Sequence, residues 1–326
     1  MLISERKNTD LMETDIPHRR QGWSAVWAFL QKELRRNGNL YLMVLPAVAG
    51  FIIFHYLPMY GIIIAFKKFD LILGYDASPW AGLRNFQSFL SDPFALRVVK
   101  NTLLLGFYSL LFGFWPPIVL ALLLNELTSK RLKKIFQSIS YLPHFIATVV
   151  VVGMMMELLG ANGAVNLILQ QIGLEPIAFF NQSQYFRSLY IGSGIWQGIG
   201  WGSILYLAAL SGIDPELYEA SYMDGANRFR RMWHISLPGM LPTITILFIL
   251  HASDIINIGF EKVYLLSNPA IYDVGDVIQT YVYRRGIIDR DFSYATAVGL
   301  MNSVAAFLIL YVANRASRAM KQNSLW

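Results

Sequence analysis

The chain alternates between long apolar stretches and short polar connections. Apolar runs occur near residues 40–66, 102–126, 138–159, 189–212, 241–265 and 294–314. A helix of about 20 residues crosses a hydrocarbon core of about 30 Å. The strands of a membrane barrel would instead give segments of about ten residues with alternating polarity, and this pattern is missing here. The pattern therefore predicts an all-α integral membrane protein, a bundle of six transmembrane helices.

Composition supports a membrane protein. Of 326 residues, 55% are hydrophobic and only 15% are charged, whereas ordinary soluble domains carry roughly 25% charged residues. The chain has no cysteine, which excludes disulfides, thiolate metal sites and a thiol nucleophile. Residues 1–21 are polar and charged, so no cleavable signal peptide is expected.

The net charge of +6 is informative mainly through the location of the basic residues. Most of the 27 Lys and Arg residues fall in the N-terminal tail, the second and fourth connections and the C-terminal tail. Basic residues concentrate on the cytoplasmic side of membrane proteins. We therefore expect both termini in the cytoplasm, and lipid rather than nucleic acid around the chain.

The predicted division of the chain falls after residue 39. Residues 1–39 form a cytoplasmic tail, in which Trp23, Trp27 and Leu30 recur at helical spacing and are followed by Lys32, Arg35 and Arg36. This pattern favours an amphipathic helix lying in the membrane interface, with a solvated cytoplasmic helix as the alternative. Residues 40–326 form the six-helix domain, and its external segments are too short for another domain.

Prolines and glycines predict irregular places in the spans. Pro58 should kink the first span, and Pro116 and Pro117 the second, because proline removes a backbone donor. Gly194, Gly198 and Gly202 recur every four residues and favour close approach of another helix. Whether that helix belongs to this chain or to another subunit stays open.

The fifth span carries polar residues at helical spacing, namely His251, Asp254, Asn257 and Glu261. On insertion scales an Asp in mid-helix costs about 2.5 to 3.5 kcal/mol, whereas an Ile, Leu or Phe contributes only about 0.3 to 0.6 kcal/mol. We therefore expect one helix with a polar stripe that faces a protected or water-filled interior.

The stripe has two interpretations. In the first, His251, Asp254 and Asn257 line a path for a polar solute; in the second, they form interhelical hydrogen bonds, with Glu261 at the membrane edge. Further polar residues in other spans are weaker candidates for the path: His55, Glu157, Gln197 and Asn302.

A polar segment at about residues 214–240 separates the fourth and fifth spans. Asp214 can cap a helix that starts at Pro215, and Gly225 permits a turn near Asp224. A second, basic helical piece follows, and we expect "LPGMLP" to end it before the fifth span. The segment is thus predicted to be a cytoplasmic helix-turn-helix that docks into a groove on a soluble partner.

"EASYMDGANRFRRMWHISLP" in this segment resembles the EAA loop of permease subunits of binding-protein-dependent ABC importers. Ser221 replaces the second alanine of the family pattern, a small change. The resemblance implies that the loop docks on an ATPase, through the following residues: Glu219, Ala220, Ser221, Asp224, Gly225, Ala226, Leu237 and Pro238. In that role Glu219 contacts the ATPase or caps the loop's own backbone, and Gly225 permits the turn.

Other stretches extend the resemblance from about residue 40 onward. "GLRNFQSFLSDPF", "KNTLLLG", "LALLLNE" and "LLSNPA" are similar to carbohydrate-uptake permeases with the type I importer fold. "RRNGNLYLMVLPAVAGFIIFHYLPMYGIIIAFKKFD" resembles permeases for oligosaccharides derived from polysaccharides, and alginate import is the nearest match. An acidic sugar would sit awkwardly beside Asp254 and Glu261 unless these are paired or turned away.

The resemblance implies a transport subunit, not an enzyme, and a multi-pass position in the bacterial cytoplasmic (inner) membrane. The expected partners are two ATP-binding cassette subunits, a second and different permease, an extracytoplasmic solute-binding protein and an oligosaccharide. No Gly is followed by Lys in the chain, so a phosphate-binding loop of the GxxxxGK[ST] type is excluded. No cofactor is expected in this chain, and ATP and Mg would bind the partner subunits.

Two other classes of membrane protein fit the sequence less well. An ion-coupled secondary transporter could use intramembrane His and Asp residues as a proton relay, but it has no use for a docking loop. An intramembrane enzyme is disfavoured because HExxH, GxSxG and cysteine are all missing from the sequence.

Overall fold

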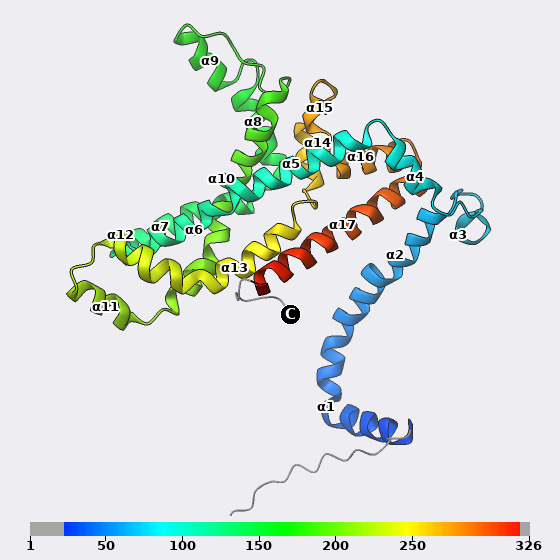
Figure 1. Ribbon diagram of the computed structural model, residues 1–326, viewed down its shortest axis with the longest axis horizontal. Helices are drawn as coiled ribbons and strands as arrows, with labels where there is room; N and C mark the ends of the chain where they lie inside the picture. Colours follow the sequence, from blue (N-terminus) through cyan, green and yellow to red (C-terminus); the bar gives the residue numbers. More distant parts are fainter. Residues whose placement is uncertain (1–22, 320–326) are drawn as a thin grey trace, which may run out of the picture. The chain divides into compact units, whose positions relative to one another are not determined.

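The structure, a computed structural model, describes residues 23–319 and is built from helices (Figure 1). The chain divides into two compact units, the first up to Tyr60 and the second from Gly61 onward. The division that the sequence predicts after residue 39 stays a prediction.

The first unit is a single interrupted helix. Helix α1 (Trp23–Phe51) is kinked at Asn37, whose φ of −120° and ψ of 20° are not helical. The part before the kink coincides with the predicted amphipathic helix, whose position in the membrane interface stays a prediction. After α1 come a π-turn (Ile52–Tyr56) and helix α2 (Leu57–Met59). The π-turn directly precedes Pro58 and relieves the clash between the proline ring and the preceding turn.

The 3-10 segment Tyr60–Phe66 crosses the boundary between the units, and the second unit contains the remaining helices. Its α-helices are α3 (Gly74–Ala77), α4 (Arg84–Ser91), α5 (Ala95–Gly113), α6 (Trp115–Asn125), α7 (Lys130–Tyr141), α8 (Thr148–Leu159), α9 (Ala164–Gln171), α10 (Ser183–Ser211), α11 (Pro215–Met223), α12 (Arg228–Arg231), α13 (Leu237–Ser253), α14 (Phe260–Leu266), α15 (Tyr272–Gly275), α16 (Ile278–Tyr283) and α17 (Phe292–Ala319). Short 3-10 turns lie at Leu142–Phe145 and Pro269–Ile271, and π-turns at Met232–Ser236 and Arg284–Ile288.

Five helical stretches within residues 23–319 are long and apolar enough to cross a membrane. They are Arg36–Phe66, Ala95–Asn125, Thr148–Gln171, Arg228–Ala252 and Phe292–Arg315. The predicted span near 189–212 is helix α10, whose 29 residues would measure about 43 Å. Glycines and polar residues lower its hydropathy, and it packs against α5, α6, α7 and α13. The sixth crossing and the side on which the termini lie stay predictions.

The prediction of a kink in the second span is confirmed. Helix α5 ends at Gly113 and α6 starts at Trp115, so the helix is interrupted just before Pro116 and Pro117. The prediction that residues 138–159 form the third span as a single helix is wrong. Leu142–Phe145 forms a 3-10 turn around Pro143, and α8 starts only at Thr148.

The prediction that "LPGMLP" ends the basic helix is also wrong. Helix α12, the π-turn at Met232–Ser236 and α13 run on as one helical stretch, Arg228–Ala252. The N–H of Leu237 donates to the carbonyl of Met232, five residues back. This wider turn makes room for the ring of Pro238, which would clash with the carbonyl four residues before it in a regular helix.

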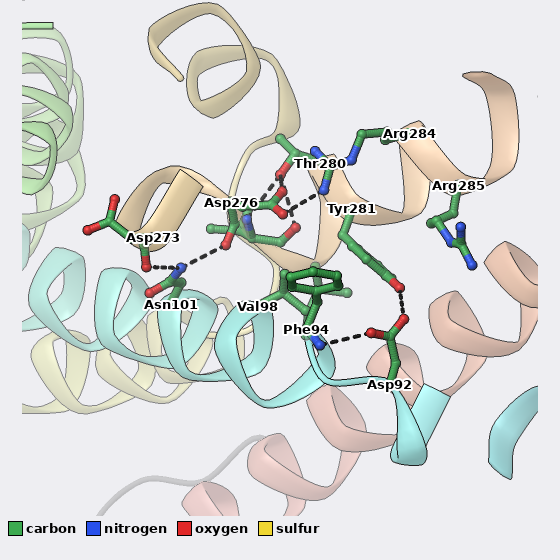
Figure 2. Close-up of polar contacts among 12 residues, drawn as sticks. Asp92, Phe94, Val98, Asn101, Asp273, Asp276, Thr280, Tyr281, Arg284 and Arg285 are labelled. Atoms are coloured by element: carbon green, nitrogen blue, oxygen red, sulfur yellow. Dashed lines mark hydrogen bonds and ion pairs between the residues drawn. The ribbon is translucent and has the colours of Figure 1, made fainter. Parts of the chain in front are cut away.

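A cluster of buried polar residues holds helices α15 and α16 against α5 (Figure 2). The carboxylate of Asp276 is fully buried and lies 2.6 Å from the guanidinium of Arg284. The amide of Asn101 on α5 donates to the backbone carbonyls of Asp273 and Asp276, at 2.9 and 3.0 Å. Because these partners satisfy the buried charge and carbonyls, the segment after α14 is fixed to the start of α5.

A second polar group lies beside it, at the turn between α4 and α5. The hydroxyls of Tyr281 and Tyr294 and the backbone N–H of Phe94 donate to Asp92. Burial alone would raise the pKa of Asp92, but these hydrogen bonds and nearby Arg285 hold it below its ordinary value. Together the two groups brace the end of the second unit that is opposite α11 and α12 (Figure 1).

Candidate functional site

A cavity of about 710 Å³ lies within the second unit and is lined by α5, α6, α10, α13, α14 and the segment between the last two. Ligand sites commonly measure about 300 to 1,000 Å³ and combine apolar walls with a few polar groups. The side chains with polar or aromatic character in this lining are Ser109, Phe114, His144, Tyr190, Trp201, Tyr206, His251, Asp254, Asn257 and Lys262.

The polar residues of the fifth span do not form a stripe on one helix, so that expectation is wrong. Helix α13 ends at Ser253, residues 254–259 are not helical, and α14 begins at Phe260. Ile, Asn and Gly in this stretch are weak helix formers. The side chain of Gln279 donates to the carbonyl of Ile256 at 2.7 Å, which supplies a partner that a helical amide would otherwise provide.

The interruption nevertheless brings three of these residues to one place. His251, Asp254 and Asn257 all line the cavity, and the side-chain carbonyl of Asn257 accepts a hydrogen bond from Asn302 at 3.2 Å. Glu261 instead lines a second cavity of about 580 Å³, which shares His144, Gly194 and Gly198 with the first. A role of the three residues in a solute path stays a prediction.

Two of the other polar candidates, Gln197 and Asn302, are connected to this region of the second unit. Gln197 lines the second cavity and donates to the carbonyl of Ile146 at 2.8 Å, and Asn302 contacts Asn257. Glu157 is exposed on α8. His55 belongs to the first unit and stacks on Phe51.

The glycine repeat of α10 faces the cavity more than a neighbouring helix. Gly194, Gly198 and Gly202 all line the cavity. A Cβ at Gly202 would lie tightly against Pro117 of α6, one at Gly194 would lie 3.8 Å from the Nζ of Lys262 on α14, and one at Gly198 would meet nothing within 4 Å. The closest backbone contact of α10 occurs at Gly200, where an added Cβ would lie 2.0 Å from the carbonyl oxygen of Ser140. The glycines of the repeat therefore mainly widen the cavity.

Four further cavity residues escaped the sequence-based reasoning. The rings of His144 and Trp201 stack with centroids 4.5 Å apart and an angle of 2° between planes, and Lys262 lies over Tyr190. Trp and Tyr are frequent at membrane interfaces, so their sequence positions gave no sign of a cavity. Lys262 directly follows Glu261, for which a position at the membrane edge was one interpretation, so the sequence did not point to Lys262 as a cavity residue.

The loop between the fourth and fifth spans is a helix-turn-helix, as predicted. Asp214 accepts a hydrogen bond from the N–H of Glu216 at 3.0 Å and caps α11, which ends at Met223, one residue before the expected end. Gly225 adopts a φ of +73°, a conformation that L residues rarely take. The side chain of Asn227 then caps α12 through the N–H of Arg230, at 2.9 Å.

The residues assigned to ATPase docking lie along this loop, and most of them are at its surface. Glu219, Ala220, Asp224, Gly225 and Pro238 are exposed. Ser221, Ala226 and Leu237 are half-buried, and the hydroxyl of Ser221 donates to the carbonyl of Tyr218 at 2.8 Å. Within the described chain, Asp214 and Asn227 supply the side-chain caps of this loop, and Glu219 supplies none.

The loop also displays large apolar side chains that the sequence-based reasoning did not select. Tyr222, Met223, Phe229 and Trp233 are each between 69% and 84% exposed. Such a group on a polar segment marks a protein or membrane contact. In the sequence, the indication of such a contact surface is that four large apolar residues stand among charged ones. Arg231, in contrast, is tied to the bundle by an ion pair with Glu126 at 3.6 Å.

The chain matches known transport proteins over most of its length. Residues 113–322 match the family described as binding-protein-dependent transport system inner membrane component. Protein LplB of Bacillus subtilis (strain 168) is 42% identical over 294 residues, which cover 90% of this chain and 92% of LplB. The polygalacturonan/rhamnogalacturonan transport system permease protein YteP of the same organism is 41% identical, with the same coverage.

Solved structures agree with these relatives. A chain of a bacterial ABC transporter involved in the import of the acidic polysaccharide alginate superposes with a TM-score of 0.83 at 42% identity. The match covers 90% of this chain and 99% of that one. A second structure, of a bacterial alginate ABC transporter in complex with an alginate pentasaccharide-bound periplasmic protein, gives a TM-score of 0.82 at 41% identity. It covers 91% of this chain and 99% of that one. This chain therefore belongs to the inner membrane permease components of binding-protein-dependent ABC importers, among the permeases for sugars and oligosaccharides.

Proposed function

We propose that this permease moves an oligosaccharide into the cytoplasm by alternating access, driven by ATP hydrolysis on two separate ATPase subunits. The observation that carries the proposal is the pairing, in one unit, of an exposed docking loop with a cavity of about 710 Å³. The relatives handle galacturonan-type and alginate polysaccharides, so alginate-derived oligosaccharides are among the substrates proposed.

The loop of α11 and α12 supplies the coupling. Its exposed Glu219, Ala220, Asp224 and Pro238 and its exposed apolar side chains offer a surface to an ATPase subunit. The loop is continuous with α13 through the π-turn at Met232–Ser236, so a displacement of the loop is passed to the cavity wall as a rigid body. ATP and Mg bind the ATPase subunits in this scheme.

The cavity supplies the solute path. His251, Asp254 and Asn257 provide donors and acceptors for sugar hydroxyls, and the interruption at residues 254–259 places them at its wall. Non-helical backbone at membrane depth is tolerated where it is buried in protein or lines a water-filled cavity. A path for a polar solute accounts for both the polar side chains and the interrupted helix.

Three further partners complete the proposal. An extracytoplasmic binding protein delivers the sugar, as the alginate pentasaccharide-bound periplasmic protein would in the similar complex. A second permease, different from this chain, closes the other side of the path. The whole assembly resides in the inner membrane of a bacterium.

Energy coupling tests the proposal. Uptake of a labelled oligosaccharide should require ATP, stop with vanadate, and persist when an uncoupler collapses the proton gradient while ATP is maintained. Uptake that an uncoupler abolishes with ATP intact, and that vanadate leaves unchanged, would instead identify an ion-coupled transporter.

A further inference from the structure

The side chain of Lys262 brings an ammonium group to the lining of the 710 Å³ cavity. Lys262 lies in the first turn of α14, directly after the interrupted segment, and its side chain is half-buried. Its Nζ lies 5.6 Å from the centroid of the Tyr190 ring and 3.8 Å from the position of a Cβ on Gly194. A Cβ at Gly194 would be in ordinary van der Waals contact with this amine, so the amine lies close to α10 at the cavity wall.

Lys262 has no counter-charge within residues 23–319. The ion pairs of the described chain join Arg231 to Glu126, Arg284 to Asp276 and Arg285 to Asp289. Asp254 lines the same cavity without pairing with Lys262, and neighbouring Glu261 lines the second cavity. A half-buried ammonium without a partner is costly, so its position favours a ligand that brings a negative charge.

The surroundings of Lys262 fit one class of such ligand. Tyr190 and Trp201 line the same cavity. One face of Trp201 is stacked on His144 and Lys262 lies over one face of Tyr190, and a free aromatic face packs well against the C–H surface of a pyranose ring. Asp254 and Asn257 offer acceptors for hydroxyl groups. A free phosphate or a short acid would use the ammonium only, whereas a uronate ring would use all three features.

We propose that Lys262 binds a carboxylate of a uronate oligosaccharide and makes the permease selective for acidic over neutral sugars. This inference rests on the proposed function of the cavity. A charge-assisted hydrogen bond between ammonium and carboxylate is about twice as strong as a neutral one. Asp254 then accepts hydrogen bonds from hydroxyl groups of the same ligand.

The experiment compares Lys262→Gln and Lys262→Arg in the complete complex, reconstituted with its ATPase subunits, second permease and binding protein. The probes are trigalacturonate and its methyl ester, which lacks the charges. Lys262→Gln should reduce ATP-driven uptake of trigalacturonate about tenfold, the size of one hydrogen bond to a charged group, and leave the ester unaffected. Lys262→Arg should retain most of the uptake. Lys100→Gln, which removes an exposed lysine outside the cavity, is the matched control.

A binding measurement supplements uptake. Binding of trigalacturonate to the purified complex without binding protein should weaken with salt in the wild type and lose that dependence in Lys262→Gln. Full uptake by Lys262→Gln, equal losses in the Gln and Arg variants, or equal losses for both probes would overturn the inference. A wild-type complex that imports neutral oligosaccharides and no uronate would also overturn it while leaving the proposed function intact. A complex that imports no oligosaccharide with ATP would contradict the proposed function itself.

Discussion

Gly106 sets how close the interrupted segment comes to helix α5. A Cβ at this position would lie 1.9 Å from the carbonyl oxygen of Ile255 and 2.8 Å from its Cα. These are backbone atoms, so a rotamer change cannot relieve the contact. The placement of Asp254 and Asn257 at the cavity wall therefore depends on a residue without a side chain.

Gly106→Ala should accordingly destabilise the permease. Overpacking of this kind costs about 1–3 kcal/mol, and the displaced segment should also lower uptake. The measurement is the thermal unfolding of the purified complex together with its uptake rate. Gly192→Ala is the control, because a Cβ there meets nothing within 4 Å and alanine favours the helix. Equal stability of the two variants would contradict the role assigned to Gly106.

Single residues were only partly predictable from the sequence. His251, Asp254 and Asn257 stand out because polar residues in an apolar run are costly to insert. Lys262 and Gly106 do not stand out, because their importance comes from contacts with Tyr190, Gly194 and Ile255 on elements far along the chain. Such contacts follow from helix packing, which the local sequence does not specify.

The elements were predicted best where a local chemical signal exists. The cap at Asp214 and the turn at Gly225 depend on neighbouring residues only, and both were anticipated. The continuous helix through Pro238 was missed because a π-turn accommodates the ring, and nothing in the sequence separates this outcome from a break. The end of α13 at Ser253 was missed because Gln279, a distant residue, satisfies the freed backbone.

The turn at Gly225 gives a test at this scale. Its φ is +73° and an added Cβ would meet nothing within 4 Å, so a substitution is strained only through the backbone conformation. That strain is about 1–2 kcal/mol for an L residue, but asparagine tolerates it well. Gly225→Val should therefore reduce copurification of the ATPase subunits several-fold, whereas Gly225→Asn should remain near the wild type. Similar copurification of both variants would exclude a requirement for this turn.

At the scale of the whole molecule, the class of the protein was predictable and its exact course through the membrane was not. Apolar runs and low charge indicate a membrane protein, and residues 23–319 agree, because they form helices of which five stretches are long and apolar enough to cross a membrane. Helix α10 was expected to span by length, yet glycines and polar residues reduce its hydropathy. Because it packs between other helices, it needs less apolar surface than a helix exposed to lipid.

Different elements form the two ends of the second unit. The loop of α11 and α12 lies at the opposite end from α4 and α16 (Figure 1), and the basic residues that predict a cytoplasmic face include Arg228, Arg230 and Arg231 of that loop. This end should therefore face the cytoplasm and be covered by ATPase subunits.

Labelling with a membrane-impermeant maleimide tests this expectation most directly, because the chain contains no cysteine and single cysteines report one position each. Met223, which is 84% exposed, lies on the loop of α11 and α12. Ile72, which is 94% exposed, lies in the connection between the first and second spans, which we expect on the outer side of the membrane. In intact spheroplasts only Ile72→Cys should react. In inverted vesicles Met223→Cys should react, and assembly with the ATPase subunits should protect it. Reaction of Met223→Cys from the outside of spheroplasts, or no protection by the ATPase subunits, would contradict the account.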